Sequence, residues 1–100
     1  MYARIGTFDV SPENLDELTT LFHAQVVPAF SEHSGFIGYQ AFVDRERGRF
    51  VGISLWRTRS ELEGSVATAQ RALNSASNIG AVTVGEPQIL EMAFDARAQQ

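Results

Sequence analysis

The chain has 100 residues, 44% of them hydrophobic, which predicts one globular domain and excludes a disordered chain. Its net charge is −4, and the arginines of its central turn alternate with acidic residues, which excludes the basic patch of a nucleic-acid-binding protein. The absence of cysteine excludes disulfides, thiolate catalysis and cysteine-based metal sites.

The N-terminal third predicts a strand followed by a helix. Residues 2–9 form the first strand, and Ser11 before Pro12 is typical of an N-cap with proline at the first helical position. An apolar stripe at helical spacing follows; it comprises Leu15, Leu18, Leu21, Phe22 and Val26. Pro28 lies within this pattern, and we expect a kink there because the apolar face continues beyond it. The alternative is an end near Val27 and a further turn.

A hairpin and a second helix come next. Residues 36–43 and 49–57 are rich in aromatic and β-branched residues, and they flank a charged turn that ends in Gly48. Ser60 and Glu63 have the spacing of a capping box, so we place the N-cap of the second helix at Ser60.

The C-terminal part completes the pattern. The second helix carries an apolar stripe and ends near Gly80; the stripe comprises Leu62, Val66, Ala69, Leu73 and Ala76. Residues 81–84 and 88–94 predict a last strand region, interrupted at Pro87. We therefore expect a single domain over residues 1–95 and a frayed tail over residues 96–100.

The order β-α-β-β-α-β predicts an α+β, ferredoxin-like fold, in which two helices cover one face of an antiparallel sheet. Without a bulge in the hairpin, one face carries Phe36, Phe42, Phe50 and Trp56, and the other carries Ile37, Tyr39, Val43, Val51, Ile53 and Leu55. Both faces are then apolar, although the face away from the helices should be polar in a lone domain. We therefore expect a homodimer through the sheet face.

Four segments carry a family resemblance that spans about residues 2–94. They are Val27-Pro28-Ala29-Phe30, Gly35-Phe36-Ile37-Gly38-Tyr39-Gln40, Ser54-Leu55-Trp56-Arg57-Thr58-Arg59-Ser60-Glu61-Leu62 and Val84-Gly85-Glu86-Pro87. Together they resemble the antibiotic biosynthesis monooxygenase (ABM) domain of the dimeric α+β barrel superfamily. The resemblance implies a homodimer with a pocket between sheet and helices. Some members of that family oxygenate polycyclic phenols or quinols without metal or flavin.

The resemblance thus implies a monooxygenase that needs no cofactor and acts on a small aromatic or quinol-like substrate. Such chemistry requires an apolar cavity, a base and a few hydrogen-bond donors. His23 on the first helix is the candidate base, and the Trp56 N–H is a candidate catalytic donor. The candidate substrate-binding residues, from strands where small residues alternate with aromatic ones, are Arg4, Phe8, Tyr39, Gln40 and Ser54.

Each main candidate has a plainer interpretation that the sequence leaves open. Trp56 fits a packing role at a strand end, Tyr39 fits the core or a dimer interface, and His23 fits an exposed helix position. The second helix lacks the histidine that many ABM-type domains carry there. The alternative to a monooxygenase is therefore a non-catalytic ligand-binding or structural homodimer of the same fold.

Several other functions are disfavoured. Haem-degrading relatives use an asparagine on the first strand together with a tryptophan and a histidine on the second helix, and this chain has none of these there. Two histidines without cysteine predict no metal site. No apolar run has the length of a membrane span, and the N-terminus lacks a signal-peptide pattern, so we expect a cytoplasmic protein that binds neither membrane nor nucleic acid.

Overall fold

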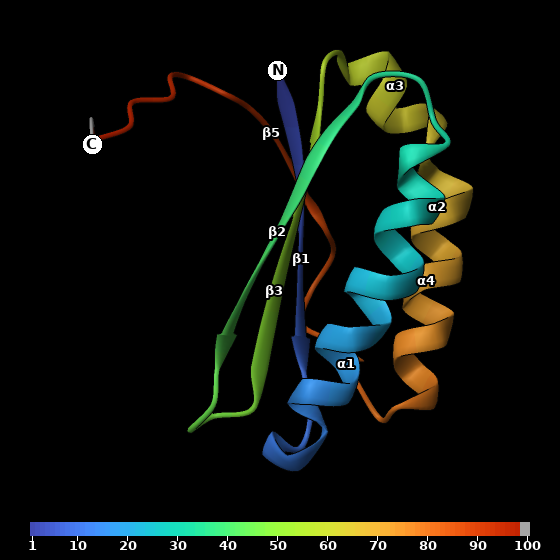
Figure 1. Cartoon of the computed structure of the whole chain (residues 1–100), viewed down its shortest axis with the longest axis vertical. Coiled ribbons are helices and arrows are strands. Elements are labelled where there is room, and N and C mark those ends of the chain that lie inside the picture. Colours follow the sequence, from blue (N-terminus) through green and yellow to red (C-terminus); the bar gives the residue numbers. More distant parts are fainter. Residues whose placement is uncertain (99–100) are drawn as a thin grey trace.

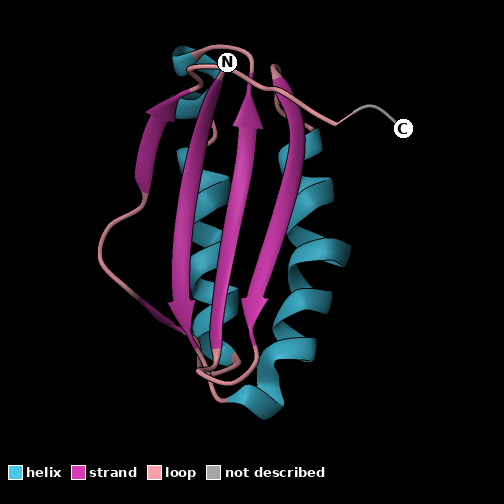
Figure 2. Cartoon of the chain, turned by 90° about the vertical axis from the view of Figure 1, so that its left-hand side faces the viewer, coloured by secondary structure: helices cyan, strands magenta, loops and turns pink. Residues whose placement is uncertain are grey.

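The computed structural model describes residues 1–98 and shows one antiparallel sheet with helices packed along one face (Figures 1 and 2). The strands are β1 (Tyr2–Asp9), β2 (Phe36–Asp44), β3 (Arg49–Trp56), β4 (Val82–Thr83) and β5 (Gln88–Glu91). Their order is β2-β3-β1-β4, with β5 also paired to β1, and every pair is antiparallel. The α+β, ferredoxin-like plan is confirmed.

The first helical region is continuous but changes type along its length. It consists of a 3₁₀ turn η1 (Pro12–Asn14), α1 (Leu15–Leu21), a π-helical turn η2 (Phe22–Val26) and α2 (Val27–Ser31). Ser11 holds the N-cap position without making a side-chain cap hydrogen bond. The π turn lies just before Pro28, which has no N–H to donate to the preceding turn. The helical region continues through Pro28 to Ser31 and does not end near Val27.

The second helical region consists of α3 (Arg59–Gly64) and α4 (Val66–Asn78), which are separated at Ser65. The predicted N-cap at Ser60 is wrong. Thr58 is the N-cap, because its backbone is extended and its Oγ1 accepts a hydrogen bond from the Glu61 N–H at 3.1 Å. Val66, which the predicted stripe had placed in the core, is 64% exposed.

The β2–β3 hairpin contains a β-bulge, whereas the predicted sheet faces rested on a hairpin without one. Phe36 pairs with Trp56, but Gly38 pairs with Leu55, so Ile37 is the extra residue in β2. Because side chains alternate along a strand, one extra residue moves every later side chain of β2 to the opposite face.

The bulge corrects the predicted composition of the two sheet faces. Tyr39 pairs with Ser54 and shares the face that the helices cover, whereas the predicted alignment placed it on the other face. Phe42 pairs with Val51 and lies on the uncovered face, where 58% of its surface is exposed. Gln40 is likewise an exposed residue of β2.

An aromatic cluster forms the core between the sheet and the helices. Phe22 of η2 packs against Phe50 with ring centroids 4.9 Å apart and against Phe8 at 5.6 Å. Trp56 is fully buried and lies edge-on to Phe30, with centroids 5.6 Å apart. Such ring pairs add to the stabilisation that comes from buried area, so this cluster fixes the spacing between the helices and the sheet.

The sheet face opposite the helices is called the outer face, and it is mostly apolar, with Thr7, Gln40 and Gln88 as its polar members on the paired strands. The registers of β1, β2, β3 and β5 place on it Ala3, Ile5, Phe42, Val51, Ile53, Leu55 and Leu90. Phe42 and Leu90 are 58% and 49% exposed. The prediction that the central hairpin is apolar on both faces is therefore confirmed.

The C-terminal strand region is interrupted as predicted, between β4 and β5. It ends at Glu91 rather than at the predicted position 94, and residues 92–98 have no regular secondary structure. They lead away from the sheet in Figure 1. Residues 99–100 of the predicted tail lie outside the described residues.

Candidate functional site

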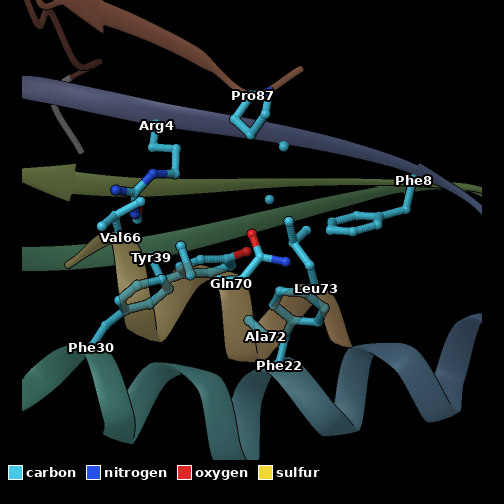
Figure 3. Close-up of a pocket in the computed structure, with 14 residues that line it drawn as sticks. Arg4, Phe8, Phe22, Phe30, Tyr39, Val66, Gln70, Ala72, Leu73 and Pro87 are labelled. Carbon is cyan, nitrogen blue, oxygen red and sulfur yellow. The ribbon is translucent and has the colours of Figure 1, made fainter. Parts of the chain in front are cut away.

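A cavity of about 270 Å³ lies between the sheet and the helices (Figure 3). Its walls come from β1, β2, β3, the first helical region and α4. The lining residues are Arg4, Gly6, Phe8, Phe22, Phe30, Tyr39, Gly52, Ser54, Val66, Ala69, Gln70, Ala72, Leu73 and Pro87. Most of them are apolar, as is typical of a site for a small organic ligand.

Three registered rows of residues across β1, β3 and β2 build the sheet side of the cavity. The first is the polar row, which consists of Arg4, Ser54 and Tyr39. The next row towards the hairpin turn contains only small residues, Gly6, Gly52 and Ala41, and the third contains Phe8, Phe50 and Val43. Neighbours within a row lie about 5 Å apart at Cβ, so the polar row forms one compact group. The row of small residues leaves room for the side chains of the two neighbouring rows, since Tyr39 approaches Gly52 and Phe8 approaches Gly6.

The mouth of the cavity lies between α4 and the connection from β4 to β5. Val66 and Gln70 of α4 and Pro87 of that connection are all exposed, although they line the cavity. In Figure 3 the Gln70 amide points from α4 into the cavity, and Pro87 lies on the other side. A ligand therefore has a route from solvent to the polar row.

Gly52 allows Tyr39 to reach the cavity. A Cβ atom at position 52 would overlap the Tyr39 hydroxyl and would lie 2.9 Å from Tyr39 Cζ. Any residue other than glycine would therefore push the ring away. With glycine there, the Tyr39 side chain lies across β3 and places its hydroxyl among the lining groups.

The Tyr39 hydroxyl is a neutral hydrogen-bond donor at physiological pH. Burial raises its pKa well above the ordinary value of 10, and the positive charge of Arg4 only partly opposes this effect. Every fully buried side-chain N and O atom within residues 1–98 has a hydrogen-bond partner. The Tyr39 hydroxyl is therefore not both fully buried and without a partner. It is open to the cavity and to a ligand.

Arg4 is a half-buried cation without a carboxylate partner among the described residues. Its Nη1 donates to Ser65 Oγ at 3.0 Å, and its Nη2 donates to the carbonyl oxygen of Leu62 at 2.8 Å. Burial lowers the pKa of Arg4, and the nearby Tyr39 is the one titratable group that opposes this shift. The guanidinium thus connects the sheet to the junction of α3 and α4 and brings a positive charge to the cavity wall.

Trp56 acts on the cavity through Ser54. The Trp56 side chain is fully buried and does not line the cavity, but its Nε1 donates to Ser54 Oγ at 2.9 Å. Ser54 does line the cavity. Because its oxygen already accepts this hydrogen bond, the Ser54 hydroxyl proton is directed to another acceptor, and a ligand in the cavity can supply one.

The structure brings together four of the seven residues proposed from the sequence. Arg4, Phe8, Tyr39 and Ser54 line the cavity, whereas Trp56 lies behind Ser54. His23 is exposed on η2 and Gln40 is exposed on β2, and neither is among the lining residues.

Sequence reasoning missed the α4 side of the cavity, above all Gln70. Val66, Gln70 and Leu73 follow one another at spacings of four and three, which places them on one helix face. A single polar amide within such an apolar face was the available signal.

The described residues contain no group of three or more histidine, aspartate or glutamate side chains placed to hold a metal ion. Over the same part of the chain, none of the helices combines the length and the apolar character needed to cross a bilayer.

The model of the antibiotic biosynthesis monooxygenase (ABM) family matches residues 1–72, which include the polar row and most of the lining residues. The chain belongs to the ABM family. Two uncharacterized proteins of Mycobacterium tuberculosis strains are 33% identical to this ABM chain over 66 residues. That match covers 66% of this chain and 28% of each relative, so the ABM chain spans little more than a quarter of their length.

Several solved structures share the fold of this chain at low sequence identity. A monooxygenase of Streptomyces coelicolor, ActVA-Orf6 in complex with nanaomycin D, has a TM-score of 0.71 at 16% identity, covering 99% of this chain and 91% of that one. SnoaB, a cofactor-independent oxygenase of Streptomyces nogalater, has a TM-score of 0.67 at 16% identity, with 94% of each chain covered. HapK of Hahella chejuensis reaches 0.76 at 11% identity over the whole of both chains.

Proposed function

We propose that this ABM protein is a cofactor-independent monooxygenase that acts on a small aromatic or quinol-like substrate. The observation that carries the proposal is the mainly apolar cavity with one polar row at its sheet side. An apolar cavity of about 150 Å³ holds benzene. A cavity of about 270 Å³ therefore suits about two fused rings. Similarity to a cofactor-independent oxygenase and to a monooxygenase with a bound ligand supports the proposal.

The chemistry requires an electron-rich ring that reacts with O₂ as an anion. The substrate supplies the electrons, one oxygen atom enters the product, and the other leaves as water. The polar row supplies positive charge from Arg4 and hydrogen bonds from Tyr39 and Ser54, which stabilise the anion and the oxygen species that follows. Apolar walls strengthen these interactions because they keep water away.

The proton that the substrate loses passes to water at the mouth. Tyr39 is a neutral phenol, Arg4 is a cation, and the Ser54 hydroxyl and Gln70 amide are not bases at neutral pH. His23 is exposed outside the cavity, so its role as a base requires a water chain or a change in structure. We place Gln70 at the mouth as the group that orients the accepting water.

Oxygen consumption with 1,4-dihydroxynaphthalene tests this function, with the rate without protein subtracted. Incorporation of one oxygen-18 atom from labelled O₂ into the product separates a monooxygenase from an oxidase. Tyr39→Phe should lower kcat about tenfold or more, because it removes one donor to the developing anion. Tyr2→Phe is the matched control, since the Tyr2 hydroxyl bonds Glu91 and does not line the cavity. Equal rates for the two variants would contradict the role of Tyr39.

The second candidate function is ligand binding without turnover. It is favoured by one observation, namely that none of the polar side chains lining the cavity is a base. Its signature is a ligand that raises the melting temperature without any oxygen consumption above background.

We also propose that two copies associate through the outer face. Phe42 and Leu90 are large apolar side chains that are 58% and 49% exposed, and they continue the apolar surface of β1 and β3. Large contiguous exposed apolar patches are uncommon on monomers. This face lies on the other side of the sheet from the cavity. The route past Pro87 and Gln70 into the cavity is therefore formed by α4 and the β4–β5 connection, not by the association of two copies.

A further inference from the structure

Among the described residues that line the cavity, Arg4 is the only charged side chain, so this part of the wall carries one positive and no negative charge. A partly buried cation is normally paired, because burial without a partner is unfavourable. Within residues 1–98 the guanidinium bonds only neutral groups, Ser65 Oγ and the Leu62 carbonyl. Its lowered pKa has burial as its main cause, in line with a cation that lacks a carboxylate.

Arg4 has donors to spare. A guanidinium carries five N–H groups, and the two hydrogen bonds to Ser65 and Leu62 use two of them. No fully buried side-chain nitrogen within residues 1–98 lacks a partner, so the Arg4 Nε, which makes no hydrogen bond among those residues, faces open space. Because Arg4 lines the cavity, that space is accessible to a ligand.

The anchoring bonds alone do not require a charge. A neutral glutamine amide also donates hydrogen bonds, so it could serve the carbonyl of Leu62 without the unfavourable burial of a cation. The positive charge of Arg4 therefore indicates an anionic partner that the described residues do not supply. An anionic oxygen on the ligand is the complementary group, since arginine binds such oxygens through charge-assisted hydrogen bonds.

We propose that the cavity binds its aromatic ligand as an anion. An anionic substituent on the ring, either a carboxylate or an ionised hydroxyl, accepts hydrogen bonds from Arg4. Tyr39 and Ser54 belong to the same polar row and donate to the same oxygen or to its neighbour. This inference deepens the proposed function and rests on it, because in a quinol-like substrate the ionised hydroxyl is the reactive form.

Binding of a matched ligand pair tests the proposal without any turnover. The probes are 2-naphthoate and 2-naphthamide, which have the same shape and differ in charge, measured by calorimetry with the intact protein at neutral pH. We expect the naphthoate to bind at least about tenfold more tightly. Equal binding, tighter binding of the amide, or no binding of either probe would overturn the proposal.

Two variants assign the preference to the charge of Arg4. Arg4→Gln should abolish the preference for naphthoate, whereas Arg4→Lys should retain most of it. Ser65→Ala removes one anchoring bond and keeps the charge, so it controls for loosening of the α3–α4 junction and should keep the preference. A preference that persists in Arg4→Gln would overturn the role of Arg4.

The second arm separates an ionised hydroxyl from a carboxylate as the natural group. The absorbance of 2-naphthol reports its ionisation, and bound naphthol should ionise about one pH unit lower than free naphthol, which corresponds to about tenfold tighter binding of the anion. A shift with naphthol supports the ionised hydroxyl, and a preference seen only with naphthoate supports the carboxylate. If naphthoate preference holds while the quinol consumes no oxygen, the oxygenase function fails and the anion site stands.

Discussion

Replacement of Gly52 by alanine tests the geometry that places Tyr39 in the cavity. The added Cβ would overlap the Tyr39 hydroxyl and would lie 2.9 Å from Tyr39 Cζ and 3.3 Å from Phe50 Cε1. Phe50 is buried in the core and the partly buried Tyr39 ring packs against that core, so movement of either ring disturbs its packing. Gly52→Ala should therefore destabilise the fold and displace Tyr39.

The expected magnitude follows from two opposing terms. Overpacking of a core costs roughly 1–3 kcal/mol. Alanine in place of glycine recovers about 0.4–1 kcal/mol, because it restricts the unfolded chain. The net loss in free energy of unfolding should lie between about 0 and 2.6 kcal/mol, and in a domain of this size each kcal/mol lowers Tm by about 4–8 °C.

Urea unfolding followed by circular dichroism measures this difference. Gly38→Ala is the matched control, since a Cβ at Gly38 of β2 would meet no atom within 4 Å. That variant should be neutral or more stable by about 0.4–1 kcal/mol. The double variant Gly52→Ala, Tyr39→Phe removes the worst overlap and should regain part of the loss. If Gly52→Ala is as stable as Gly38→Ala, the close approach of Tyr39 to position 52 is refuted.

Three further predictions concern other parts of the molecule. Hydrogen bonds from Arg57 and then Ser34 lower the pKa of Glu61 from 4.5 to about 2. A carboxyl group with a depressed pKa stabilises the fold at pH values above its pKa in the unfolded chain, and this stabilisation is lost as the pH falls from about 4.5 to about 2. The stability of Glu61→Gln should therefore fall less over that range than the stability of the wild type. Urea titrations at each pH measure the difference. Phe42→Glu on the outer face should convert a dimer into a folded monomer in sedimentation experiments, and a wild-type monomer would contradict the dimer. Trp56→Phe should lose roughly 1–3 kcal/mol of stability in denaturant titrations, because it removes the bond to Ser54 and leaves a void, and an unchanged midpoint would disprove that.

Much of the fold was predictable because its signals are local. Alternation along β1, the charged turn before Gly48 and the helical stripes each depend on neighbouring residues, and the structure has all three elements in these places. Gly48 adopts φ +73°, which fits the turn expected there. The family resemblance was carried by such segments and was confirmed.

The site was less predictable because it depends on register between strands. The extra residue Ile37 moves Tyr39 to the helix face, and no local pattern marks it, since Ile37 and Tyr39 are both compatible with either face. Thr58 and Ser60 are both acceptable caps, and the choice between them depends on where β3 ends. Gln70 can be recognised as a lining residue only when the position of α4 relative to the sheet is known.

The π-helical turn at Phe22–Val26 acts as a one-residue insertion that determines the width of the binding site. On an uninterrupted α-helix, Phe22 and Phe30 would be eight positions apart and would diverge by about 80° around the axis. The π turn absorbs one residue, so the divergence falls to that of seven positions, about 20°. Both rings therefore line the same cavity. Deletion of a single residue such as Ala24 should therefore convert the π turn into an ordinary α-helical turn and leave Phe30 seven positions, about 20°, from Phe22, whereas insertion of one residue there would rotate Phe30 away from the cavity.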